Sequence, residues 1–274
     1  MKQALASAIE AAKAAGAIMR KNLTAEKKAN EITSHDIKLE LDVRCQKLIE
    51  KKLHAAFPQI SLLGEEGEAG DAGAEYRWVV DPIDGTVNFA HGIPHASVSI
   101  ALQKRVGGRG SRIDVKARAL QHGIRNTEHE TLVGVVYDPF QDEMWTAIRG
   151  EPARMNGRII RVSKAKNLKD CIVSIGFAKN RSNLERAIPY FIWLARRVMK
   201  IRMLGSAALG LTYVASGRLD AYIERGISLW DVAAGGLILE CAGGKFWCEA
   251  TPGYHKYRMI ASNGLVHKKL PPPK

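Results

Sequence analysis

The sequence predicts an α/β fold, because segments with helical periodicity alternate with short runs of β-branched and aromatic residues. Apolar residues recur at helical spacing in 3–22 and in 182–200, as expected of amphipathic helices that pack against a core. Strand-length apolar runs such as 97–102 and 171–175 lie between these helices. With 274 residues, of which 46% are hydrophobic, the chain can bury a large core as one domain or as two closely joined halves.

Composition argues against membrane proteins and disulfide-rich proteins. No run approaches about 18 consecutive apolar residues, so we expect no transmembrane helix. The N-terminal segment lacks the long apolar core of a signal peptide and has the pattern of a mature amphipathic helix. The four cysteines show no paired spacing, as expected of reduced thiols. These features predict a cytoplasmic protein with no membrane partner.

The most informative stretch is 76–92, which begins with an aromatic and β-branched run typical of a buried strand. Pro82 has no N–H to donate to a neighbouring strand, so we expect the chain to turn there. Asp84 follows Asp81 by three residues, and a turn can bring both carboxylates and the carbonyl of Ile83 to one point. Two carboxylates and a backbone oxygen are hard ligands of the kind that Mg²⁺ prefers.

An ordinary turn is the alternative interpretation, with Asp81 as a cap and Gly85 permitting an unusual backbone angle. Acidic residues at two other element boundaries favour the metal site. Glu65 follows the apolar run 60–63, and Asp231 precedes an apolar, helix-forming stretch. The three motifs together, in this order, indicate a metal-binding cluster more specifically than any one of them does.

On these motifs, and on a fourth at 205–208, the sequence resembles the inositol monophosphatase family of Mg²⁺-dependent, lithium-sensitive phosphatases. The resemblance covers most of the chain and implies a single catalytic unit with a layered αβαβα sandwich. It places the metal motifs and a basic insertion near 104–130 in an α+β half, 1–150, and substrate-binding elements in an α/β half, 151–274. The family's usual state implies a homodimer. The matched motifs are Gly64-Glu65-Glu66, Asp81-Pro82-Ile83-Asp84-Gly85-Thr86, Gly205-Ser206-Ala207-Ala208 and Trp230-Asp231.

The resemblance implies a set of oxygen ligands that would hold about two or three Mg²⁺ ions. Carboxylates balance the charge of such ions and leave coordination positions for phosphate and water. Glu65 is also placed with the catalytic residues. The implied ligands are Glu65, Asp81, the Ile83 carbonyl, Asp84 and Asp231.

Asp42 and Thr86 are implied to position the attacking water. Asp42 lies where a short extended segment meets a helix, so a plain N-cap is its alternative role. The family usually carries threonines just before this aspartate, whereas this chain has Leu39 and Leu41. Because of this departure, the local geometry and the response to lithium do not follow directly from the family pattern.

Substrate contacts are implied at the start of the helix that follows Gly205. Free N–H groups and the helix dipole favour an anion or a hydroxyl-rich ligand there, although ordinary capping by Ser206 is a nearly equal alternative. Glu224, at the end of an apolar strand, is the implied partner of a substrate hydroxyl and the candidate for specificity. The full implied set is Gly85, Thr86, Gly205, Ser206, Ala207, Glu224 and Asp231.

The net charge of +13 is high for a metabolic enzyme, and basic residues concentrate in 104–125. This stretch belongs to a segment, 103–131, that we expect to be an insertion of roughly 20 residues relative to the family, because loops of such length are uncommon. Its charge would attract nucleic acid or another polyanion, or steer phosphate substrates. A solvated basic loop is the plainer interpretation, because no nucleic-acid motif accompanies the charges.

These inferences predict hydrolysis of a small phosphorylated metabolite by metal-activated water, without a phosphoenzyme. Inositol monophosphate or a similar polyol phosphate is the first choice of substrate. Fructose 1,6-bisphosphate, histidinol phosphate and 3′-phosphoadenosine nucleotides are alternatives within the superfamily. A regulatory member that binds RNA or protein through its basic surface is the alternative from a different class.

Overall fold

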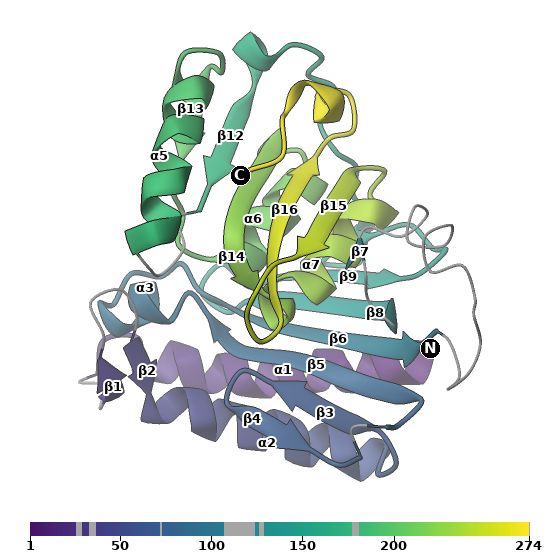
Figure 1. Cartoon of the computed structure of the whole chain (residues 1–274). Coiled ribbons are helices and arrows are strands. Elements are labelled where there is room, and N and C mark those ends of the chain that lie inside the picture. Colours follow the sequence, from purple (N-terminus) through teal and green to yellow (C-terminus); the bar gives the residue numbers. More distant parts are fainter. Residues whose placement is uncertain are drawn as a thin grey trace.

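The chain forms a mixed α/β fold in which helices and strands alternate (Figure 1). Among the described residues, no helix combines the length and the apolar character needed to span a bilayer. The structure is a computed structural model that describes residues 1–25, 29–32, 37–71, 73–106, 124–125, 129–176 and 181–273.

The helices and two main sheets stack in alternating layers (Figure 1). Helices α1 (Lys2–Asn22) and α2 (Glu40–Ala56) pack against one face of an eight-stranded sheet. Helices α6 (Ala207–Ala215) and α7 (Leu229–Cys241) lie between that sheet and a six-stranded sheet. Helix α5 (Arg181–Ala195) covers the other face of the six-stranded sheet. The predicted αβαβα sandwich is confirmed.

The eight-stranded sheet is mostly antiparallel, with a parallel pair between β3 and β5. In spatial order, its strands are β11 (Arg158–Ile159), β10 (Arg154–Met155), β9 (Glu143–Ile148), β8 (His129–Asp138), β6 (Ser97–Arg105), β5 (Tyr76–Asp84), β3 (Ser61–Gly64) and β4 (Gly67–Ala69).

The six-stranded sheet is mixed, since β12 runs parallel to both of its neighbours and β16 antiparallel to both of its own. In spatial order, its strands are β13 (Lys200–Arg202), β12 (Ile172–Ile175), β14 (Ala221–Ser228), β16 (Lys256–Ser262), β15 (Lys245–Ala250) and β7 (Ile124–Arg125). The remaining described elements are β1 (Ala29–Ile32), β2 (Ile37–Leu39), α3 (Thr86–Ala90) and the 3₁₀ helices η1 (Leu168–Asp170) and η2 (His267–Lys269).

Between Asp231 and Glu240, helix α7 is apolar on all sides because it is buried between the two sheets. Small residues allow close approach on both sides. A Cβ on Gly134 in β8 would lie 2.8 Å from the carbonyl oxygen of Ala234. A Cβ on Gly236 would lie 2.5 Å from the ring of Phe246 in β15. These contacts fix the position of α7, and with it the position of Asp231 in its first turn.

One local prediction was wrong. The predicted helix over 182–200 ends at Ala195, because the chain then turns into the edge strand β13, whose Lys200 donates its N–H to the carbonyl oxygen of Cys171. Strand β4 pairs with β3 and forms the edge of the larger sheet.

The basic stretch 104–125 falls mostly outside the described residues. Strand β6 carries the chain to Arg105, and the short strand β7 then joins the six-stranded sheet beside β15. The eight-stranded sheet continues to Ile159, beyond the predicted boundary at 150. The division into two halves stays a prediction.

We expect Gly134→Ala to destabilise the fold by about 1–3 kcal/mol, because the new methyl group would press on the backbone of α7. Urea unfolding measures this loss. Gly73→Ala is the matched control, since its methyl group meets the exposed side chain of Asp71 and should change the free energy of unfolding by less than about 0.5 kcal/mol. Equal stability of Gly134→Ala and wild type would contradict the packing described for α7.

Candidate active site

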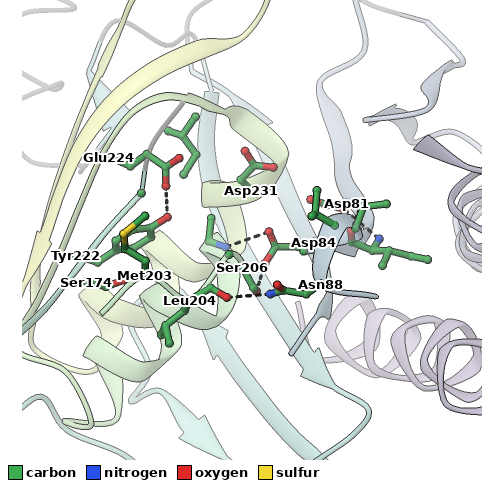
Figure 2. A pocket seen from close by; sticks show the side chains of 18 of the residues that line it. Asp81, Asp84, Asn88, Ser174, Met203, Leu204, Ser206, Tyr222, Glu224 and Asp231 are labelled. Atoms are coloured by element: carbon green, nitrogen blue, oxygen red, sulfur yellow. Dashed lines mark hydrogen bonds between the residues drawn. The ribbon is translucent and has the colours of Figure 1, made fainter. Parts of the chain in front are cut away.

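Carboxylates of three aspartates converge near the start of α7 (Figure 2). Asp81 and Asp84 lie at the end of β5, and Asp231 lies in the first turn of α7. One carboxylate oxygen from each aspartate lies within 4.8 Å of the others. The structure therefore brings these three residues of the predicted metal site together.

An irregularity in β5 turns Asp81 and Asp84 to the same side of the sheet. Asp81 lies opposite Ser99 and Asp84 lies opposite Ser97, so β5 spans three residues where β6 spans two. In a regular strand, residues three apart point to opposite faces. The extra residue of this bulge reverses the alternation, and Pro82 is tolerated there because it needs no hydrogen bond to the next strand.

The turn after β5 is held by local hydrogen bonds. The N–H of Ile83 donates to Asp81 Oδ1 at 3.0 Å, and Thr86 Oγ1 donates to the carbonyl oxygen of Ile83 at 2.8 Å. Gly85 has a φ of 91°, and a Cβ there would lie 3.0 Å from the carbonyl oxygen of His95. Any residue with a side chain would be strained at position 85, so the turn depends on glycine.

Asp84 binds the N-terminus of α6. Its carboxylate accepts hydrogen bonds from the N–H groups of Ala207 at 3.0 Å and Ala208 at 2.9 Å, and from the hydroxyl of Ser206. The same hydroxyl oxygen caps the helix by accepting the N–H of Leu209 at 3.3 Å. The expectation of free N–H groups at this helix start is therefore wrong for Ala207 and Ala208. The helix dipole favours the carboxylate that takes them.

Asp231 and Asp42 each occupy the third position of a helix and hydrogen-bond the residue before its first turn. Asp231 Oδ2 accepts the N–H of Ser228 at 2.8 Å, so Asp231 caps the helix and also belongs to the cluster. Asp42 Oδ2 accepts the N–H of Leu39 at 2.7 Å, so the N-cap is Leu39, and the alternative role of Asp42 as the N-cap residue is replaced by a capping bond from the third helical position. Asp42 is not among the residues that line the cavity over the cluster, and its action with Thr86 stays a prediction.

Glu65 reaches the same cavity from the turn between β3 and β4. Its N–H donates to the carbonyl oxygen of Val80 at 3.1 Å, which ties the turn to β5. Gln46 of α2 also holds the turn, because its Oε1 accepts the N–H of Glu66 at 3.0 Å. Glu65 is thus held close to the strand that carries two of the aspartates.

A cavity of about 370 Å³ opens over the cluster. Sequence analysis missed Asn88, Ser174 and Tyr222, which also line it. Tyr222 lies two residues before Glu224 in β14, a spacing that places both on one face and could have identified it. The predicted residues that line the cavity are Glu65, Asp81, Ile83, Asp84, Gly85, Thr86, Gly205, Ser206, Ala207, Glu224 and Asp231.

Asn88 connects three segments near the cluster, and Figure 2 shows its hydrogen bond to Leu204. It belongs to α3, and its Nδ2 donates to the carbonyl oxygens of His95 at 2.9 Å and Leu204 at 2.8 Å. Leu204 lies two residues before Ser206, the N-cap of α6, so the Asn88 side chain ties the Asp84 turn to the segment that leads into the helix that binds Asp84. The position of Asn88, two residues after the motif 81–86, was the available signal in the sequence. Nothing local indicated that its partner would lie so far along the chain.

Burial and mutual repulsion raise the pKa of both aspartates of β5. For Asp81, which is 1% exposed, burial is the main cause, followed by the nearby charges of Glu65, Asp84 and Asp231. For Asp84, burial and Asp231 raise the pKa from 3.8 to about 6, although the hydrogen bonds from α6 oppose the rise. A hard divalent cation would neutralise such a cluster, so the residues present fit the implied Mg²⁺.

The profile of one known protein family matches the chain along nearly its whole length. The profile of the Inositol monophosphatase family matches residues 1–109 and 123–271. The stretch between the two matched segments falls within the basic region predicted to be an insertion.

Relatives carry two kinds of name. The Nus factor SuhB of Pseudomonas aeruginosa is 37% identical over 252 residues, which cover 89% of this chain and 84% of the relative. The Nus factor SuhB of Escherichia coli is 35% identical over 271 residues, which cover 96% and 92%. The inositol-1-monophosphatase of Rhizobium meliloti is 38% identical over 206 residues, which cover 74% and 68%.

Solved structures of proteins with the same two kinds of name superpose on this chain. The extragenic suppressor protein suhB from Bartonella henselae superposes with a TM-score of 0.81 at 31% identity, over 96% of this chain and 95% of that chain. The inositol monophosphatase from Anabaena superposes with a TM-score of 0.78 at 34% identity, over 97% and 92%. The match to the family profile, the relatives and the fold lead to one conclusion: the chain belongs to the inositol monophosphatase family.

Proposed function

We propose that the protein is a Mg²⁺-dependent phosphate monoester hydrolase that acts on inositol monophosphate or a similar small polyol phosphate. One observation carries the proposal. In a member of this family, the buried Asp81 and Asp84 and the half-buried Asp231 meet beside Glu65 in a cavity of about 370 Å³, which is large enough for one small ester.

The chain's own residues have distinct roles in this proposal. Glu65, Asp81, Asp84, Asp231 and the Ile83 carbonyl would hold the Mg²⁺. When bound, the metal would lower the pKa of a water and stabilise negative charge on the phosphate oxygens. The Ile83 carbonyl accepts the Thr86 hydroxyl and keeps a second lone pair for a cation. The remaining groups orient the reactants.

Water and substrate would be positioned from opposite sides of the cavity. Thr86, with Asp42, would orient the attacking water, and Glu224 would accept a hydroxyl of the alcohol part of the ester. The first turn of α6, which begins at Ala207 shortly after Gly205, would line the substrate site. Homodimer formation and lithium sensitivity, which the resemblance implies, stay predictions.

A second candidate is a regulatory role that uses a basic surface to bind RNA. Several relatives are called Nus factors, and exposed cations gather where β12 and β13 begin. There, the N–H of Lys200 donates to the carbonyl oxygen of Cys171 at 3.4 Å, and Lys269 Nζ donates to the carbonyl oxygen of Lys166 at 2.7 Å. In the part of the chain that the structure describes, neither Lys166 nor Lys200 forms an ion pair with an acid.

We expect Asp81→Asn to lower kcat for phosphate release by about 100-fold or more, because it removes a charged metal ligand. The fold should persist, since the amide oxygen can still accept the N–H of Ile83. Phosphate release with Mg²⁺ is measured from inositol 1-phosphate, fructose 1,6-bisphosphate, histidinol phosphate and 3′-phosphoadenosine 5′-phosphate. Asp170→Asn, at an exposed position in η1, is the matched control. Wild-type turnover by Asp81→Asn would remove Asp81 from the site.

We expect the metal-free protein to lose stability as the pH rises from 3.8 towards about 6. The folded pKa of Asp84 lies above its unfolded value, so the folded state binds the proton more tightly and its contribution is lost through this window. Mg²⁺ requires the ionised carboxylates and should therefore raise Tm more at pH 7.5 than at pH 5. Thermal unfolding with EDTA or Mg²⁺ measures both effects. An equal shift at the two pH values would contradict a carboxylate site for the metal.

For the second candidate, we expect Lys166→Glu with Lys200→Glu to weaken retention of single-stranded RNA by about tenfold or more and to reduce its dependence on salt. Fluorescence anisotropy at low and moderate salt gives both values. Lys2→Glu with Lys13→Glu, at exposed positions of α1, changes the net charge equally and is the control. Equal loss in both double variants would indicate a response to net charge alone, and absence of RNA binding by wild type would exclude this role.

A further inference from the structure

Tyr222 lies in the floor of the cavity and contacts Glu224 directly (Figure 2). Both residues belong to β14 and point to the same face, because they are two residues apart. The phenol of Tyr222 donates a hydrogen bond to Glu224 Oε2. Tyr222 is 4% exposed, so its hydroxyl serves the carboxylate and is shielded from bulk water.

The backbone of β12 makes room for the carboxylate of Glu224 on the other side. Gly176 follows β12, and its N–H donates to the carbonyl oxygen of Ile223 at 3.0 Å. A Cβ on Gly176 would overlap the Glu224 carboxylate. Glu224 is therefore packed against bare backbone on one side while the Tyr222 hydroxyl fixes its oxygen on the other.

The ring of Tyr222 is in turn supported from behind by α6. A Cβ on Gly210 would lie 3.0 Å from Cδ1 and Cε1 of Tyr222. Gly210 does not line the cavity, so this helix residue acts on the site through the ring alone. A continuous series of contacts thus runs from Gly210 through Tyr222 to Glu224.

We propose that Tyr222 is a positioning residue that sets the selectivity of the cavity for hydroxyl-bearing phosphate esters by fixing the carboxylate of Glu224. This inference rests on the proposed function, in which Glu224 accepts a hydroxyl of the alcohol. A carboxylate held in one orientation meets a substrate hydroxyl without first losing side-chain freedom. Esters without hydroxyls gain nothing from that orientation. The effect of Tyr222 therefore depends on the substrate.

The test compares inositol 1-phosphate with cyclohexyl phosphate, which has the same ring size and no free hydroxyls. Tyr222→Phe should lower the ratio of their kcat/KM values by about five- to twentyfold, as expected for loss of a hydrogen bond to a charged group. Most of the change should appear in KM for inositol 1-phosphate. In a Glu224→Gln background, Tyr222→Phe should change the ratio far less, because the carboxylate it orients is gone.

Tyr257→Phe is the matched control, since Tyr257 is a buried tyrosine of the neighbouring strand β16 and does not line the cavity. It should leave the ratio as in wild type. If Tyr222→Phe does not fold, Gly210→Ala tests the same contacts. Its methyl group would push the Tyr222 ring from behind and should lower the ratio in the same direction.

The outcomes separate this inference from the function on which it rests. A wild-type enzyme that hydrolyses neither ester overturns the proposed function and the inference together. A wild-type enzyme that prefers inositol 1-phosphate, with the preference unchanged in both Tyr222→Phe and Gly210→Ala, overturns the role of Tyr222 alone. Equal losses on both esters would also overturn it, because they indicate a structural role without selectivity.

Discussion

The structure around the site depends on one electrostatic constraint, the burial of several carboxylates at one point. Asp81 and Asp84 are 1% and 6% exposed, and both lie close to Asp231. Buried carboxylates repel one another and are removed from the water that would hydrate their charges. Repulsion and desolvation together raise the pKa values of Asp81 and Asp84. The surrounding elements hold the carboxylates together against this repulsion. Packing of α7 between the sheets supplies part of that rigidity.

Local features of the backbone serve the same constraint. The bulge in β5 turns two aspartates to one face, and Gly85 allows the tight turn that follows. Asn88 then joins this turn to the segment that precedes α6, so the helix start and Asp84 cannot separate easily. Each of these features keeps the acids close to one another against their mutual repulsion.

Local signals were sufficient to predict the alternation of helices and strands and the acids at element ends, whereas the layered sandwich and the complete ligand set were implied by the resemblance to the family. The β-branched run before Asp81 and the helix-forming stretch after Asp231 mark element ends without knowledge of their partners. The hydrogen bonds of Asn88 were beyond such reasoning, since its partner Leu204 lies 116 residues away. The N-cap at Leu39 was missed for a different reason. Leucine has no side-chain acceptor, and the capping bond comes from Asp42 three residues later.

The two aspartates of β5 are stabilised by different partners. As a result, the pKa is raised to different extents in Asp81 and Asp84. Asp84 accepts N–H groups from the start of α6, whose dipole favours the ionised form and limits its pKa to about 6. Asp81 accepts one N–H within its own turn and faces Glu65 and the other two aspartates, so its pKa rises further. Asp84 is therefore ionised near neutral pH with the help of the protein alone. Asp81 has no such helix start to offset burial and repulsion, so a bound cation would relieve more unfavourable charge at Asp81 than at Asp84.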